Sequence, residues 1–298
     1  MTFLTVFAAP KPFTSSHIAT IQRNAIQSWM HLGSDVEVFL VGEESGVEEV
    51  AAEFGARYFP DVRRNQWGTP LVSSIFDLAR QASQAPVLAY LNADIMILPD
   101  FLAAVRQVAS QAEKFLIVGR RWDLDVRQEL EFGADWAARL HDEVKAHGRL
   151  HGLAGSDYFV FPRPLLADMP DFAVGRAGWD NWVIYEACRS GWMVIDGTPS
   201  LVVIHQDHDY GHLPGGKAHY DLEESQLNAA LGGGRSKMYT VLDTNKVLIN
   251  GQIRDTSPSF PRLLRRAEVL LMNGKRQGLR WSLLRKVRRL RRRITGTL

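Results

Sequence analysis

The sequence predicts an α/β fold in which a mostly parallel central sheet has helices on both faces. Short apolar segments suited to buried strands alternate with longer segments whose apolar residues recur at helical spacing. Such alternation implies crossover connections between parallel strands. At 298 residues, of which 46% are hydrophobic, the chain is long enough to bury a substantial core.

The first two-fifths of the chain carries the clearest alternation. The dipeptide at 69–70 is Thr-Pro, and it predicts a helix start because threonine can cap a helix and proline suits its first position. We expect strands over 2–8, 36–41, 56–59, 87–91 and 115–119, and helices over 15–32, 46–54, 69–83 and 100–112.

Beyond residue 119 the pattern is less regular. It predicts helices over 131–147 and 179–189, a strand over 157–162 and a last apolar strand over 201–204. We place the boundary of the α/β domain at residue 255, so that residues 256–298 form a tail of basic amphipathic helices.

Asn92 and Asp94 directly follow the buried strand expected over 87–91, and a second apolar run comes after them. Residues two apart on an extended chain point the same way, and ligands of parallel sheets bind outside the carboxyl ends of the strands. A carboxylate between two apolar runs is costly unless a cation meets it. Mg²⁺ or Mn²⁺ holding phosphates would be such a cation, and the alternative is a carboxylate that caps the next turn.

A second candidate is Asp180, which begins a helix between Trp179 and Trp182. Tryptophan faces commonly pack against sugar rings, and a neighbouring carboxylate can take a proton from an acceptor hydroxyl. The alternative is that Asp180 caps the helix and that the tryptophans fill the core.

Three histidines and two aspartates lie within residues 205–212, directly after an apolar strand. This density of metal-binding side chains favours a metal site, and His205 follows the strand most directly. The alternative is a polar loop with one structural histidine. Zinc is disfavoured because the spacing is not helical and no cysteine accompanies the histidines.

Two more loops are expected at the same edge of the sheet, where basic groups can hold a phosphate. One carries Lys11, and the other runs from Arg63 to Thr69. In the second loop Arg64, Asn65 and Thr69 are candidates for nucleotide contact, whereas Arg63 is expected in solvent. Candidates on the acceptor side are Arg120, Trp122, Asp123, Asp157, Trp179 and Trp182.

Several nucleotide-binding motifs are missing. The loop after the first strand reads AAPKP over residues 8–12, so the dinucleotide-binding GxGxxG is absent there. The sequence also lacks a Walker A motif and the glycine-rich, Thr-Arg-containing loop of sugar-phosphate nucleotidyltransferases.

Taken in order over residues 2–212, these motifs resemble the GT-A class of nucleotide-sugar-dependent glycosyltransferases, of the family 2 type. Residues 92–94 resemble the DxD motif of that class, while Asp180 and His205 stand where the class has its acidic catalytic residue and its late metal ligand. The resemblance implies a GT-A-like fold and Mn²⁺ or Mg²⁺ bound by Asp94 and His205. Because Asn92 carries no charge, a metal-independent member of the class stays open.

The resemblance further implies transfer of a sugar from a nucleoside-diphosphate sugar to a hydroxyl of a glycan or lipid-linked acceptor. Ala9, Pro10 and Lys11 would contact the donor base, and Asn92 would contact a donor hydroxyl. Asp180 would act as general base and give inversion. The alternatives are a nucleotide-sugar- or glycan-binding protein without turnover, and a sugar-phosphate nucleotidyltransferase.

Charge is unevenly distributed along the chain. Residues 261–298 hold 13 basic residues and one acidic residue, a net charge of +12, which leaves 22 basic and 32 acidic residues and a net charge of −10 for residues 1–260. In the tail, Leu283, Val287 and Leu290 recur at helical spacing among arginines, which predicts a basic helix on an anionic membrane surface. The alternative is a tail that docks on the acidic body or on a second subunit. Nucleic-acid binding is disfavoured because no recognisable module accompanies the charge.

Cys188 is the only cysteine, so an intrachain disulfide is impossible and a reducing cytoplasm is expected. The apolar segment 3–9 lacks a basic flank and is too short for a signal peptide, and no run approaches a transmembrane helix. We therefore expect a cytoplasmic protein that lies peripherally on the inner face of the membrane through its tail.

Overall fold

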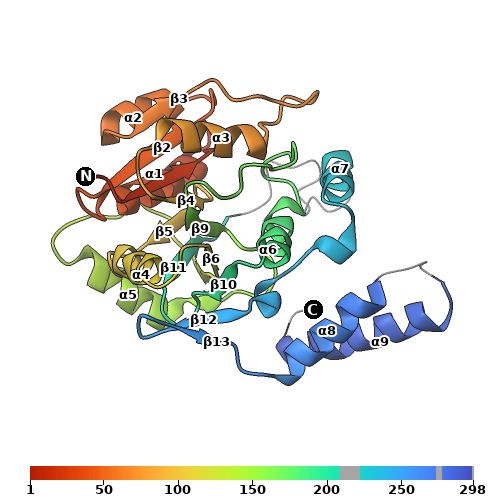
Figure 1. Ribbon diagram of the computed structural model, residues 1–298. Coiled ribbons are helices and arrows are strands. Elements are labelled where there is room, and N and C mark those ends of the chain that lie inside the picture. Colours follow the sequence, from red (N-terminus) through yellow and green to blue (C-terminus); the bar gives the residue numbers. More distant parts are fainter. Residues whose placement is uncertain (209–221, 273–276, 297–298) are drawn as a thin grey trace.

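A nine-stranded sheet forms the centre of the protein (Figure 1). The structure is a computed structural model that describes residues 1–208, 222–272 and 277–296. In spatial order the strands are β13 (Gln252–Asp255), β12 (Lys246–Ile249), β10 (Met193–Asp196), β6 (Phe115–Val118), β9 (Tyr158–Pro162), β4 (Val87–Leu91), β1 (Leu4–Ala8), β2 (Val36–Val41) and β3 (Arg57–Phe59). Five of the eight neighbouring pairs are parallel, and the antiparallel pairs involve β9 or β13. The predicted α/β class with a mostly parallel sheet is confirmed.

Helices cover both faces of this sheet and bury its central strands on both sides. Along β1, Leu4 and Val6 belong to one core cluster and Phe7 to the other, as the alternation of a strand requires. The first cluster includes α1 (Ser16–Met30), α2 (Val47–Phe54), α4 (Asp100–Ala109) and α5 (Trp136–His147), and the second includes α3 (Val72–Ala82) and α6 (Trp179–Arg189). The chain continues with α7 (Glu223–Leu231), the 3₁₀ turns η3 (Arg235–Lys237) and η4 (Val241–Asp243), and then α8 (Phe260–Met272) and α9 (Gly278–Thr295).

A second, four-stranded sheet carries two of the candidate site residues, His205 and Asp123. Its order is β5 (Ile95–Ile97), β11 (Val203–Gln206), β7 (Trp122–Leu124) and β8 (Arg149–Leu150). The register sets His205 of β11 opposite Ile95 of β5 on one side and opposite Asp123 of β7 on the other. Three segments that are distant in sequence are thereby aligned at one place.

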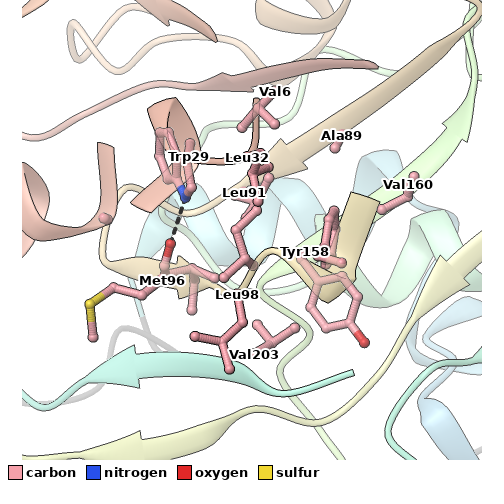
Figure 2. Packing of buried hydrophobic residues seen from close by; sticks show 14 of the residues in the cluster. Val6, Trp29, Leu32, Ala89, Leu91, Met96, Leu98, Tyr158, Val160 and Val203 are labelled. Carbon is pink, nitrogen blue, oxygen red and sulfur yellow. Dashed lines mark hydrogen bonds between the residues drawn. The ribbon is translucent and has the colours of Figure 1, made fainter. Parts of the chain in front are cut away.

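Helix α1 anchors this second sheet to the core. The indole Nε1 of Trp29 donates a hydrogen bond of 2.8 Å to the carbonyl of Ile95, which Figure 2 shows beside the packed side chains of Leu91 and Met96. One residue earlier, the hydroxyl of Ser28 accepts a hydrogen bond of 3.2 Å from the amide of Ile97. Both bonds are buried, so the two ends of β5 are attached to α1.

Several element boundaries differ from expectation, among them the following three. Helix α3 begins at Val72 rather than at residue 69, because Pro70 and Leu71 are extended and form isolated bridges with Arg64 and Ala173. Helix α5 begins at Trp136, and the residues before it form a loop. The strand after residue 200 spans Val203–Gln206 and is not the last, since β12 and β13 extend the sheet edge with partly polar sequences.

The C-terminal helix pair, α8 and α9, packs side by side at the end of the molecule remote from β3 (Figure 1). Glu268 of α8 is 2% exposed and accepts hydrogen bonds of 2.7 Å from Arg288 and from Arg291 of α9. Arg265 of α8 donates to the carboxylate of Asp243 in η4 at 2.8 Å, which attaches the pair to the body. In the described ranges 1–208, 222–272 and 277–296, no helix has both the length and the apolar character needed to cross a bilayer.

Replacing Glu268 by alanine should loosen the helix pair, because Arg288 and Arg291 would then lose a largely buried counter-charge. Removing one partner of a buried ion pair costs about 3 kcal/mol of unfolding free energy. Urea unfolding and the rate of tryptic cleavage within α9 measure the effect, with exposed Glu113→Ala as the control. Equal stability and equal cleavage of the two variants would contradict this role.

The same carboxylate predicts the direction of the pH dependence. Burial opposes ionisation of Glu268, but hydrogen bonds from Arg291 and Arg288 outweigh it and hold the pKa below the usual range. A depressed pKa means that the stabilisation is present at neutral pH and is lost as the pH falls through the folded-state pKa. Tryptic cleavage within α9, assayed after brief exposure to acid, should therefore increase in the wild type.

Candidate active site

Asp94 lies in the turn between β4 and β5, with its side chain only 13% exposed. Its Oδ2 is 3.1 Å from Nε2 of His208 and 3.9 Å from Nε2 of His205, and its Oδ1 is buried with no hydrogen-bond partner. Burial raises the pKa of Asp94, but His208, His205 and Lys11 outweigh it and hold the pKa well below its ordinary value. Asp94 is therefore an ionised carboxylate with one unsatisfied oxygen.

The three side chains Asp94, His205 and His208 fit a divalent cation. Their ligand atoms lie within 4.8 Å of one another, and the orphaned Oδ1 of Asp94 offers a further lone pair. A donor set that mixes carboxylate and imidazole suits Mn²⁺ better than Mg²⁺, which prefers oxygen alone. The sequence missed His208 as an individual ligand, although it marked the segment; Asp209 and His212 of that segment lie outside the described residues.

Asp123 lies behind His205, on the side away from Asp94. Its Oδ1 is 3.5 Å from Nδ1 of His205, and Oδ1 of Asp207 is 3.7 Å from the same nitrogen. Burial lowers the pKa of His205, but the carboxylates of Asp123 and Asp94 outweigh it and raise the pKa. Nδ1 of His205 is buried without a hydrogen bond, so Asp123 acts on this ring through its nearby negative charge, while Nε2 faces Asp94.

Arg121 links this cluster to the start of β9. Its guanidinium donates to Asp123 at 3.0 Å and forms a close ion pair with Asp157, whose carboxylate accepts a 2.7 Å hydrogen bond from Asn92. The side-chain amide of Asn92 is thus engaged with Asp157. Sequence reasoning missed Arg121, although its spacing of two from Asp123 on a strand would place both on one face.

Arg120, which the sequence put on the acceptor side, points elsewhere. Its guanidinium donates to the carbonyls of His151 and Leu150 at 2.6 and 3.4 Å, and these hydrogen bonds stabilise the segment that follows β8. Trp122 is half-buried in β7 and packs against the first core cluster. The structure therefore gathers Asp157 and Asp123 with Asp94 and His205, but it does not gather Arg120 or Trp122 with them.

Asp180 begins α6, with its Oδ1 accepting a 3.3 Å hydrogen bond from the amide of Gly178. Burial raises its pKa to about 6, and the nearby charge of Asp157 contributes to the rise while backbone amides oppose it. A carboxyl group with this pKa is ionised at neutral pH and binds a proton more readily than an ordinary aspartate. Asp180 is therefore suited to accept a proton.

Trp179 and Trp182, which flank Asp180, lie in the core. The ring of Trp179 packs against Tyr90 and Phe159 with centroid separations of 5.2 and 5.3 Å, and Trp182 packs against Phe172 at 5.2 Å. They are 5% and 8% exposed. The structure thus places both residues as the core-filling alternative describes.

The loop after β1 lies close to Asp94. Lys11 exchanges backbone hydrogen bonds with the side chain of Gln22 at 2.6 and 2.9 Å, and its charge contributes to the low pKa of Asp94. Ala9 is half-buried and Pro10 is buried beside it. The structure therefore brings a positive charge to the candidate metal ligands, as the sequence predicted for this edge.

The loop before α3 forms a separate polar group. Arg64 pairs with Glu44 at 2.9 Å, while the side chain of Asn65 donates to Glu224 of α7 at 2.8 Å and accepts from the amide of Thr69 at 3.0 Å. Arg63, expected in solvent, is 60% exposed and pairs with Asp171. A pocket of about 590 Å³ is lined by Arg63, Arg64, Asn65, Leu71, Asp171, Leu227 and Leu231. Within the part of the chain that the structure describes, no hydrogen bond or ion pair joins this group to Asp94.

An apolar pocket of about 410 Å³ has none of the candidate metal ligands in its lining. It lies between the loop after β7 and α5, and Leu124, one of its lining residues, accepts a 2.9 Å hydrogen bond from the amide of Asp207. Its apolar lining consists of Leu124, Val126, Leu130, Phe132, Trp136 and Leu140. The rim carries Arg127, Arg139, Glu131 and Glu143, so the pocket combines an apolar interior with a charged edge.

Comparison with known protein families found no matching family model, and comparison with curated proteins found no match. Among solved structures, the chain is similar to glucosyl-3-phosphoglycerate synthase from Mycobacterium tuberculosis in complex with Mn²⁺, UDP and glucosyl-3-phosphoglycerate. That similarity has 18% identity, covers 87% of this chain and 88% of that one, and has a TM-score of 0.46.

Two further solved structures are similar over smaller parts. A mannosyltransferase from Pyrobaculum calidifontis in complex with GDP-Man and Mn²⁺ is 14% identical over 70% of this chain and 58% of its own, with a TM-score of 0.45. S. aureus TarS in complex with UDP-GlcNAc is 11% identical over 44% of this chain and 37% of its own, with a TM-score of 0.31. All three solved structures contain a nucleotide or a nucleotide sugar.

The position of Asp123 generates a prediction for metal affinity. Asp123→Asn removes the charge that orients His205, and loss of such an orienting carboxylate weakens metal binding by about 10- to 100-fold. Titration with Mn²⁺, followed by its electron paramagnetic resonance signal, measures the affinity, and thermal unfolding checks the fold. Exposed Asp125→Asn, two residues along the chain, is the control. Unchanged Mn²⁺ affinity in a folded Asp123→Asn protein would remove this role.

Proposed function

We propose that this protein is a glycosyltransferase that moves a hexosyl group from a nucleoside-diphosphate sugar to a hydroxyl of a glycan or lipid-linked acceptor. One observation carries the proposal. At the carboxyl end of β4, an ionised carboxylate with a free oxygen lies beside two imidazoles, and the charge of Asp157 contributes to raising the pKa both of His205 in this group and of Asp180. A site for a diphosphate-bound cation and a proton acceptor are thus combined in one region.

Asp94, His205 and His208 would hold Mn²⁺ or Mg²⁺. When bound, such a cation neutralises negative charge on the leaving diphosphate. The positive charge of Lys11 near Asp94 supports the same placement of phosphates. Asp123 and Arg121 would keep His205 and the neighbouring carboxylates in place.

Asp180 would act as the general base. As the acceptor oxygen forms its bond to the anomeric carbon, the bond from that carbon to the diphosphate breaks, and the hydroxyl proton passes to Asp180. Attack on the face opposite the diphosphate gives inversion. The pKa of about 6 supports this role, because the carboxylate is ionised at neutral pH yet can accept the proton.

The remaining predicted contacts divide between donor and acceptor. Ala9, Pro10 and Lys11 would contact the base, and Asn92 would contact a ribose or sugar hydroxyl. The loop residues Arg64, Asn65 and Thr69 would contact the rest of the nucleotide.

On the acceptor side we propose Asp157, whereas Arg120 and Trp122 lie away from the site and Trp179 and Trp182 fill the core. The apolar pocket beside Leu124 supports an acceptor with an apolar portion, such as a lipid-linked sugar. The net charge of +12 in residues 261–298 supports action at an anionic membrane surface on the cytoplasmic side.

A thermal-shift screen tests donor binding. Each of UDP, GDP, CMP and dTDP is added with and without Mn²⁺ to wild-type protein, to Asp94→Asn and to the exposed control Asp100→Asn. We expect one nucleotide to stabilise the wild type and Asp100→Asn, with a larger shift in Mn²⁺, and Asp94→Asn to lose the metal-dependent part. If a nucleotide raises the unfolding temperature equally with and without Mn²⁺, the metal site is contradicted. If no nucleotide raises it, donor binding is contradicted.

Replacing Asp180 tests turnover separately from binding. Asp180→Asn should lower kcat by about 10²- to 10⁴-fold while leaving the nucleotide shift intact, because a general base acts in the chemical step. In the wild type, kcat should fall as the pH drops below about 6, where the carboxylate of Asp180 becomes protonated. Glu186→Gln on the same helix is the control. A protein that binds nucleotide sugar without turnover would show no difference between the two variants.

A further inference from the structure

The C-terminal helix pair exposes an unusual amount of apolar surface. Among the described residues, twelve large apolar side chains are exposed, and seven of them lie on α8 and α9. These are Phe260, Leu263, Leu270, Leu279, Leu283, Leu290 and Ile294. The apolar exposure of the molecule is therefore concentrated on two adjoining helices rather than scattered singly.

On α9 the exposed apolar residues form one stripe. Leu279, Leu283, Leu290 and Ile294 are spaced by four, seven and four residues, which places them along a single helix face. Leu283 and Leu290 are 50% and 43% exposed, whereas their neighbour Leu284 is 1% exposed. The helix thus buries one leucine and presents the stripe outward.

The side of α9 that meets α8 is charged. Arg288 and Arg291 reach Glu268 of α8, and at 100° per residue they lie roughly 90–150° around the helix from the stripe. A buried carboxylate requires its counter-charges, so these two bonds fix which side of α9 faces α8. The inner side of α9 therefore carries the two arginines and the buried Leu284, and the leucine stripe lies outside.

The outer surface carries only positive charge. Glu268 is the sole acid in residues 261–298, and it is buried. The exposed basic residues of the helix pair are Arg266, Arg280, Arg285, Lys286, Arg289, Arg292 and Arg293. Long basic side chains beside an apolar stripe can reach phosphates while the stripe enters an apolar phase.

We propose that the C-terminal helix pair docks onto an anionic bilayer surface through the leucine stripe of α9, and that Glu268 is the positioning residue that holds this stripe outward. The inference deepens the proposed membrane association and does not depend on the glycosyl-transfer chemistry. A nucleic acid would use the basic residues but would leave the leucines in water. A second copy of the chain that packed through its own helix pair would bring the same positive charge against this surface.

Co-sedimentation of the full chain with vesicles tests the docking. One set of vesicles is phosphatidylcholine alone, and the other is equal parts of phosphatidylcholine and phosphatidylglycerol. The variant Leu283→Ser with Leu290→Ser keeps every charge, and it should bind the anionic vesicles about tenfold more weakly or worse. Leu227→Ser with Leu231→Ser, which removes two similarly exposed leucines from α7, is the matched control and should bind like the wild type.

Glu268→Gln distinguishes positioning from simple charge attraction. It raises the positive charge of the helix pair by one, so attraction alone predicts tighter binding to anionic vesicles. Loss of the positioning carboxylate predicts weaker binding, and circular dichroism checks that the helices persist. Tighter binding by a folded Glu268→Gln protein would overturn the positioning role.

Other outcomes would overturn the docking surface itself. These are equal binding to both kinds of vesicle, unchanged binding by the α9 leucine variant, a leucine-dependent dimer that excludes vesicles, or leucine-independent binding to RNA in place of vesicles. Nucleotide stabilisation measured on the same preparations keeps the two proposals apart. Nucleotide binding without vesicle binding overturns only the surface, and vesicle binding without nucleotide binding overturns only the proposed catalytic function.

Discussion

The pairing of β11 with both β5 and β7 is the constraint on which the candidate site depends. It holds His205 between two carboxylates, with Asp94 on the Nε2 side and Asp123 on the Nδ1 side. A shift of β11 by one residue would turn His205 to the opposite face, because side chains alternate along a strand. The hydrogen bond from Trp29 to Ile95 restricts that freedom, since it ties β5 to α1 within the core.

The pKa values of Asp123 and Asp180 are shifted in opposite directions. Burial raises the pKa of Asp123, but hydrogen bonds with His151 and Arg121 and the charge of Arg121 outweigh it and hold this pKa well below its ordinary value. Asp180 has no such partner among the contacts described, and burial raises its pKa to about 6. One carboxyl group thus stays ionised, whereas the other takes up a proton more readily. This difference in pKa is the physical basis for assigning the first to cation binding and the second to proton transfer.

The parts of the site that follow from strand ends could be predicted, and those that depend on side-chain direction could not. Asp94 follows a strand of continuous apolar residues, so its position at the sheet edge follows from periodicity and topology alone. Arg121 and Arg120 are adjacent, and only the short strand β7, which has no sequence signature of its own, decides that Arg121 faces the acids. Likewise α3 begins at Val72 because Pro70 bridges Arg64 and Leu71 bridges the distant Ala173, which keeps both residues extended against the local helix-start signal.

For the C-terminal helix pair, too, the sequence predicts the pattern of residues but not which side of the helix faces outward. Periodicity predicted an apolar stripe and a basic face on α9, but a stripe of leucines is equally suited to pack inward against a neighbouring helix. The single acid in the segment decides between these arrangements. Buried Glu268 must lie where Arg288 and Arg291 can reach it, so the charged side of α9 becomes its inner side. One carboxylate among 13 basic residues therefore determines which surface the end of the chain offers to a partner.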